Sequence, residues 1–218
     1  MEQAIYDFTI QTLGKATLPS PLSVSYFTGE EKRVLFNIYL KHYEDYRTPD
    51  GLPLSMEVAG PREKIFFDPS KTKAAIVTCG GLCPGINDVI RAAVMELYYR
   101  YGVKNVIGIK YGFQGLIPSY RHDIKELTPE AVKDIHTLGG SILSSSRGRQ
   151  EIGEMVDALK RLNVDIFFCI GGDGTMRATE CIAAEITRRD LNIAVVGIPK
   201  TIDNDLNLIQ RSFGFDTA

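Results

Sequence analysis

Three short segments combine glycine, hydroxyl and charged residues at spacings that suit the chemistry of phosphate groups. They read CGGLCPG (79–85), GGDGT (171–175) and PKTIDND (199–205). Each one directly follows an apolar run that is typical of a buried strand. Because ligands of open α/β sheets sit outside the carboxyl ends of the strands, we expect the three segments to converge on one face of the fold.

The first segment places three glycines just before a helical pattern. Glycine lets the backbone approach an anion closely, and the free N–H groups and dipole of a helix start favour negative charge. The segment lacks both the Gly-Lys-Ser/Thr ending of a P-loop and GxGxxG spacing. A tight strand-to-helix turn without a ligand is the alternative interpretation.

The second and third segments carry carboxylates. Asp173 stands between glycines, which leave space for it to hold Mg²⁺, directly or through water, beside phosphate groups. Asp203 and Asp205, two residues apart and close to Lys200, offer a general base and a second acid near such a metal. A plain turn would not need the four special residues of GGDGT, whereas an Asp/Asn turn with capping roles remains the alternative for 199–205.

A fourth segment, GGSILSSSRG (139–148), joins hydroxyl groups to Arg147 between glycines. A guanidinium matches phosphate oxygens with two parallel hydrogen bonds, so this segment also suits phosphate binding. Alone, it would be interpreted equally well as a polar surface loop.

The surrounding pattern predicts the elements that position these segments. Apolar runs predict strands over 74–79, 103–110, 165–170 and 192–198, and apolar residues at helical spacing predict helices over 86–101, from 129, over 152–159 and over 176–186. Continuous apolar strands that alternate with amphipathic helices indicate a mostly parallel sheet covered on both faces. We therefore expect an α/β fold: a three-layer, Rossmann-like domain.

Residues 1–73 differ, because they hold six of the ten prolines. Proline interrupts strands and helices, so this part is predicted as an irregular N-terminal extension that packs on the main body or on a partner. Its best strand candidate is 32–40, and a partly disordered leader fits 11–25 equally well. The predicted division is an extension over 1–73 and a nucleotide-binding α/β domain over 74–218.

Composition and charge argue against several classes of protein. Lys plus Arg is 25 and Asp plus Glu is 27, so the net charge is 25 − 27 = −2, which argues against a dedicated nucleic-acid or anionic-membrane binder. No apolar run reaches the roughly 18 residues of a membrane helix, and the N-terminus lacks a signal-peptide pattern. The four cysteines show no CxxC spacing, so we expect reduced thiols and a cytoplasmic location.

Six motifs in order resemble those of the phosphofructokinase family: TCGGLCPGIN (78–87), YGFQGL (111–116), GGSILSSSRG (139–148), GGDGT (171–175), PKTIDND (199–205) and FGFDTA (213–218). GGDGT alone would not identify the family, because NAD kinases and diacylglycerol kinases carry a similar segment. PKTIDND separates this sequence from them.

The resemblance implies a 6-phosphofructokinase, which transfers the γ-phosphoryl group of ATP to the 1-hydroxyl of fructose 6-phosphate with Mg²⁺. It implies that Gly81 and Arg147 act on the transferring phosphoryl group and that Asp203 takes the hydroxyl proton. The further roles that it implies are nucleotide binding by Gly81, Phe113, Arg147, Gly148, Gly172, Asp173, Gly174 and Thr175, sugar binding by Thr201, Ile202 and Asp203, and metal binding by Asp173 and Asp205. It also implies a homo-oligomer, a dimer or tetramer.

Gly174 and Lys200 bear on the phosphoryl donor. Pyrophosphate-using relatives carry Asp where Gly174 stands, and two unit charges about 4 Å apart repel by roughly 4 kcal/mol at an effective dielectric constant of 20. Gly174 removes that obstacle to ATP, whereas Lys200 is shared with the pyrophosphate enzymes. The combination resembles the ATP-dependent enzymes of plants and trypanosomes, so ATP is favoured and pyrophosphate is the alternative donor.

The resemblance covers only the front half of the family's chain. We therefore expect that the second, substrate-binding domain is absent or truncated and that the chain is a fragment with the nucleotide-binding half nearly complete. Other readings stay open: a lipid or nucleotide kinase with a GGDGT segment, a non-catalytic regulatory subunit, and a nucleotide-binding module.

Overall fold

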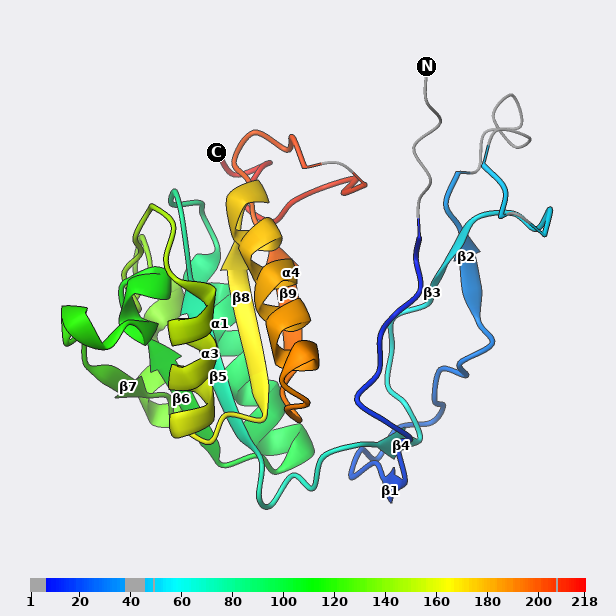
Figure 1. Cartoon of the computed structure of the whole chain (residues 1–218), viewed down its shortest axis with the longest axis horizontal. Coiled ribbons are helices and arrows are strands. Elements are labelled where there is room, and N and C mark those ends of the chain that lie inside the picture. The colour runs from blue at the N-terminus through cyan, green and yellow to red at the C-terminus, as the bar shows by residue number, and fades with distance from the viewer. Residues whose placement is uncertain (1–6, 38–45, 49, 207) are drawn as a thin grey trace. The chain divides into compact units, whose positions relative to one another are not determined.

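The computed structural model of this protein describes residues 7–37, 46–48, 50–206 and 208–218. The chain forms two compact units, which meet in the sequence between Phe66 and Phe67. Figure 1 shows the course of the chain from blue at the N-terminus to red at the C-terminus.

A five-stranded sheet organises the second unit, in the order β7-β6-β5-β8-β9. Four neighbouring strands are parallel, and β7 runs antiparallel to β6 at one edge. The strands are β5 (Lys73–Thr78), β6 (Asn105–Ile109), β7 (Ile124–Glu126), β8 (Ile166–Gly171) and β9 (Ala194–Pro199). The predicted α/β fold with a mostly parallel sheet is confirmed.

Helices cover both faces of this sheet. They are α1 (Ile86–Met95), which continues as the π-helical turn η2 (Glu96–Tyr101), α2 (Pro129–Val132), α3 (Ile152–Arg161) and α4 (Asp173–Arg188), with 3₁₀ turns η3 (Gly112–Leu116), η4 (Pro118–Tyr120) and η5 (Ile135–Thr137). Figure 1 shows α3 and α4 on the face of the sheet nearer the viewer.

The central strand β5 shows why three layers form. Its side chains alternate, so that Ile76 lies in a buried cluster with Ile90 of α1. Val77 lies in the other cluster, with Leu159 of α3 and Ile182 of α4. Successive strand residues point to opposite faces, and here each face buries apolar residues against a layer of helices.

Several elements differ from their predicted extents. The helix predicted from 129 is a single turn, and the short edge strand β7 was not expected. Helix α4 begins at Asp173 rather than after GGDGT, because the N–H groups of Thr175 and Met176 both donate to the Gly172 carbonyl, each at 2.9 Å. Asp173, Gly174 and Thr175 therefore belong to a helix start and not to a loop.

The first unit is irregular, as expected, and has two small antiparallel pairs. β1 (Leu18–Pro19) pairs with β4 (Lys64–Ile65), and β2 (Arg33–Leu35) pairs with β3 (Ser55–Glu57). The predicted strand over 32–40 is thus present at 33–35, while 38–40 lie outside the described residues.

This unit is held by hydrogen bonds and by the aromatic contacts of Phe36 with Phe8 and Tyr46, without a buried apolar core among its described residues. Of its described residues, no hydrophobic side chain is buried. The Arg62 guanidinium instead donates to the carbonyls of Thr28 and Gly29, at 2.8 Å each, and to that of Val58 at 3.1 Å. Across the described part of the whole chain, no helix is long and apolar enough to cross a bilayer.

Candidate functional site

The three segments predicted to meet do lie together at one edge of the sheet. Strands β5, β8 and β9 are neighbours, and each is followed by one of the segments. The Lys200 backbone N–H donates to the Gly171 carbonyl at 2.9 Å, and the Cys79 N–H donates to the Ile170 carbonyl at 2.9 Å. The ladder of the parallel sheet therefore fixes where all three segments begin.

Lys200 ties the third segment to the first. Its side chain is buried and its Nζ donates to the Gly81 carbonyl. Burial lowers the pKa of the Lys200 ammonium and the Arg147 guanidinium lowers it further, while the Cys83 and Cys79 sulfurs act in the opposite direction. Burial also raises the pKa of the Cys79 thiol to about 12, so that this sulfur stays protonated. All four cysteines are free in the structure.

The fourth segment is fastened to the first by side-chain hydrogen bonds. Ser145 Oγ donates to the Gly80 carbonyl at 2.6 Å, and Thr78 Oγ1 donates to the Ser144 carbonyl at 2.7 Å. Arg147, two residues after Ser145, is exposed. A Cβ placed on Gly81 would lie 3.6 Å from the Nη2 atom of Arg147. Gly148, at φ 101°, continues the segment on the surface.

The second segment is closely packed at its start and open at its end. A Cβ on Gly171 would fall 2.2 Å from Thr175 Oγ1, and one on Gly172 would lie 3.3 Å from the Lys200 carbonyl oxygen. A Cβ on Gly174 would meet nothing within 4 Å. Asp173, exposed at the start of α4, forms an ion pair with Arg177 at 2.9 Å.

The third segment is ordered by its own polar groups. The Thr201 hydroxyl donates to the Asp205 carboxylate and accepts a hydrogen bond from the Asp203 N–H at 3.2 Å. Ile202 and Asp203 are exposed. The predicted sugar-binding residues are therefore together, while the described part of the chain shows no hydrogen bond or ion pair between them and Asp173.

Phe113 lies in the hydrophobic core with 8% of its surface exposed. The exposed aromatic residue beside it is Tyr111, whose ring stacks on His122 with centroids 4.3 Å apart. The nucleotide-binding role of Phe113 stays a prediction, which the small exposed area of this residue does not favour.

The sequence pattern missed two groups of contacts. The buried residues Asn87 and Ser212 make two and three hydrogen bonds around the site, although neither residue type draws attention by itself. The FGFDTA motif also packs on the first segment, where Cys83 Sγ donates to the Phe213 carbonyl at 3.0 Å. Its closeness to CGGLCPG could not be read from the sequence, because the two residues are 130 positions apart.

The predicted magnesium ligands, Asp173 and Asp205, are single carboxylates on two different segments. Among the described residues no three His, Cys, Asp or Glu side chains gather as a metal cluster. Mg²⁺ typically takes one or two protein carboxylates and completes its shell with water and substrate phosphates. Asp173 and Asp205 are both exposed, and their role as magnesium ligands stays a prediction.

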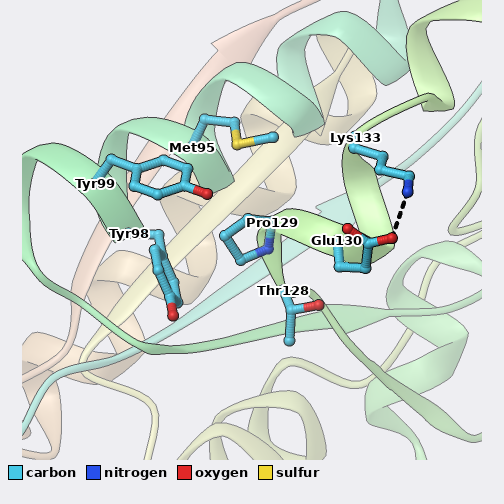
Figure 2. A pocket seen from close by; sticks show the side chains of 7 residues that line it. All are labelled: Met95, Tyr98, Tyr99, Thr128, Pro129, Glu130 and Lys133. Carbon is cyan, nitrogen blue, oxygen red and sulfur yellow. Dashed lines mark hydrogen bonds and ion pairs between the residues drawn. The ribbon is translucent and has the colours of Figure 1, made fainter.

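A pocket of about 330 Å³ lies elsewhere, at the end of α1 away from Gly85. Figure 2 shows its lining, formed by Met95, Tyr98, Tyr99, Thr128, Pro129, Glu130 and Lys133. It contains none of the predicted site residues.

A parallel α/β sheet whose strand ends carry glycines, an arginine and carboxylates is typical of proteins that handle phosphate groups. The Phosphofructokinase family profile matches residues 73–218. The chain therefore belongs to the phosphofructokinase family.

Curated relatives extend the match to the N-terminal unit. The ATP-dependent 6-phosphofructokinase of Borreliella burgdorferi is 48% identical over 97% of this chain and 48% of its own length. The protein of the same name from Trypanoplasma borreli is 53% identical over 97% of this chain and 44% of its own. The chain thus spans about half the length of these relatives.

Solved structures support the fold. A pyrophosphate-dependent phosphofructokinase from Marinobacter aquaeolei superposes with a TM-score of 0.59 and 20% identity, over 66% of this chain and 37% of that one. Pichia pastoris phosphofructokinase superposes with a TM-score of 0.59 and 21% identity, over 76% of this chain and 20% of that one. At these identities the likeness concerns the fold alone.

Proposed function

We propose that this protein, at its full natural length, is a 6-phosphofructokinase that uses ATP and Mg²⁺ to convert fructose 6-phosphate to fructose 1,6-bisphosphate. The observation that carries the proposal is the convergence of Gly81, Arg147 and the 199–205 segment at one sheet edge. Relatives that are 43–53% identical over 97% of the chain bear the name ATP-dependent 6-phosphofructokinase.

The proposed reaction assigns a task to each group. Asp203 removes the proton from the 1-hydroxyl, and the oxygen forms a bond to the γ-phosphorus. The bond from that phosphorus to the β,γ-bridging oxygen breaks, and ADP leaves. Arg147 and the Gly81 N–H offset the charge on the transferring group, so that catalysis is mostly positioning and charge neutralisation.

Magnesium would be held by Asp173 and Asp205. A divalent cation offsets charge on phosphate oxygens and so supports the transfer. Gly172, Gly174, Thr175 and Gly148 would line the nucleotide, while Thr201 and Ile202 would contact the sugar.

Two observations favour ATP over pyrophosphate as the donor. The space beside Gly174 is open, and the Lys200 ammonium is already engaged by the Gly81 carbonyl. Lys200, the residue shared with pyrophosphate-dependent enzymes, therefore binds a backbone carbonyl of the protein itself. A pyrophosphate-dependent enzyme is the second candidate, because Lys200 is the residue that it shares with those enzymes.

Other functional classes are less well supported. A kinase for another substrate would not need PKTIDND, and a regulatory subunit would not need both Asp173 and Asp203, which are present and exposed. The proposal extends to a homo-oligomer in the cytoplasm, with no nucleic-acid or membrane partner.

Replacing Asp203 tests the assigned chemistry. Asp203→Asn keeps the size and shape of the side chain but removes the base, so turnover is expected to fall at least about 100-fold while nucleotide binding persists. Asp190→Asn, an exposed position in the turn after α4, is the matched control. Turnover that persists in the Asp203 variant would remove that residue from the mechanism.

A further inference from the structure

Ser212 forms hydrogen bonds to the residues on both sides of the 202–203 stretch, Thr201 and Asn204. Ser212 is 3% exposed. Its Oγ accepts a hydrogen bond from the Thr201 N–H at 2.8 Å, and its own N–H donates to Asn204 Oδ1 at 2.7 Å. One buried residue thus holds the chain on both sides of the 202–203 stretch, and with it the backbone that presents the Asp203 carboxylate.

Asn204 also holds this stretch in place. Its Nδ2 donates to the Gln210 carbonyl at 3.0 Å, and its backbone has φ 52°, in the left-handed region that Asn adopts more readily than most residues. The turn after Asp203 is therefore fixed by an unusual backbone geometry and by two side-chain hydrogen bonds.

The Asp203 carboxylate itself is unrestrained. Within the described residues it takes part in no hydrogen bond or ion pair, and it is exposed. The position of this side chain depends on the Asp203 backbone, which is held by its N–H bond to Thr201 Oγ1 and, through the Thr201 N–H, by Ser212.

We propose that Ser212 is a positioning residue for the proposed base: its hydroxyl fixes the backbone of Thr201 and, through it, the backbone that carries the Asp203 side chain. This inference rests on the proposed function, in which Asp203 is the base. Loss of the hydroxyl leaves the buried Thr201 N–H without its acceptor, and a shift of about 1 Å in a reacting group can cost about 100-fold in rate.

Paired variants isolate the hydroxyl. Ser212→Thr and Ser212→Val add the same bulk and differ only in the hydroxyl group. In the protein at its full natural length, the Val variant is expected to have a kcat at least about tenfold below that of the Thr variant, with nucleotide Kd the same within about twofold. Separate contacts of Lys200 and Ser145 hold the nucleotide segments, so nucleotide binding should not follow kcat.

Thr72→Val is the matched control. Thr72 is 4% exposed and its hydroxyl donates to the Asp68 carbonyl at 2.7 Å, so this variant also loses a buried hydroxyl bond. It lies just before β5, away from the strand ends that carry the site, and its kcat is expected to stay at the wild-type level.

The outcomes separate the two proposals. Equal kcat in the Thr and Val variants of an active protein, or a nucleotide affinity that falls in step with kcat, would overturn the role of Ser212 alone. A wild-type protein that does not phosphorylate fructose 6-phosphate would overturn the proposed function and this inference together. Should the Val variant fail to fold, as judged by its melting temperature, Ser212→Ala, which adds no bulk, carries the same expectation.

Discussion

At the scale of single residues, the candidate site contrasts one buried cation with exposed carboxylates. Lys200 is 6% exposed and bound to the Gly81 carbonyl, whereas Asp173 and Asp203 are open to solvent. A trans peptide directs its C=O and N–H groups oppositely, so holding the Gly81 carbonyl inward turns the Leu82 N–H away from Lys200. The lysine thereby fixes the orientation of the Gly81–Leu82 peptide group in the first segment.

Lys200→Met should change how stability depends on pH. Burial lowers the folded-state pKa below the ordinary value of 10.5, so the unfolded chain binds more protons in the interval between the two values. Wild-type stability should therefore gain a component that rises with pH through that interval, and the variant should lack it. Urea unfolding of both proteins between about pH 7 and 10.5 checks this. Parallel pH profiles would contradict the buried position of this ammonium.

Gly174→Asp tests the donor assignment. Space for a side chain exists, and an acid in the first turn of α4 suits the helix dipole, so folding stability should hold. The new carboxylate would repel the nucleotide phosphates, and kcat/KM for ATP should fall at least about tenfold, given about 4 kcal/mol of repulsion at close range. Gly174→Ala, which adds bulk without charge, should keep ATP use. Unchanged ATP turnover in the Asp variant would show that the argument from charge is wrong.

At the scale of elements, Asn87 joins α1 to the segment that carries Arg147. It is 2% exposed; its Nδ2 donates to the Leu138 carbonyl and its Oδ1 accepts from the Ile142 N–H, both at 2.9 Å. One side chain thus links the helix after the first segment to both ends of a polar turn.

Asn87→Leu should destabilise the protein by about 2 kcal/mol, because it removes both hydrogen bonds of a buried side chain. Nucleotide affinity should fall as well, since the support of Arg147 loosens. Asn87→Asp keeps an acceptor for Ile142 but buries a carboxylate that faces the Leu138 carbonyl, so at neutral pH it should lose at least as much stability. Urea unfolding and nucleotide titration measure both effects; a Leu variant as stable as wild type would contradict the linking role.

The elements also show what the sequence could predict. Strands β5, β8 and β9 lie within two residues of their predicted ends, because apolar runs between glycines or prolines report buried strands directly. β7 is only three residues long and has no buried residue, so it gave no apolar signal. Likewise, the contacts of Lys200 and Ser212 depend on which segments the sheet brings together, which local pattern does not encode.

At the scale of the whole molecule, burial is concentrated in one unit. The buried hydrophobic residues of the described chain begin at Ala74, and the family match begins at residue 73. The motifs could be recognised from the sequence because each is a short contiguous segment and because the six follow one another in the family's order. The first unit was predictable only as irregular, because proline-rich segments held by backbone hydrogen bonds leave no periodic pattern.

The central claim concerns the reaction, and one assay addresses it. The protein at its full natural length is supplied with fructose 6-phosphate and Mg²⁺, first with ATP and then with pyrophosphate, and fructose 1,6-bisphosphate is measured. We predict product with ATP and little or none with pyrophosphate. Product with pyrophosphate only would contradict the donor, and no product with either would contradict the proposed function.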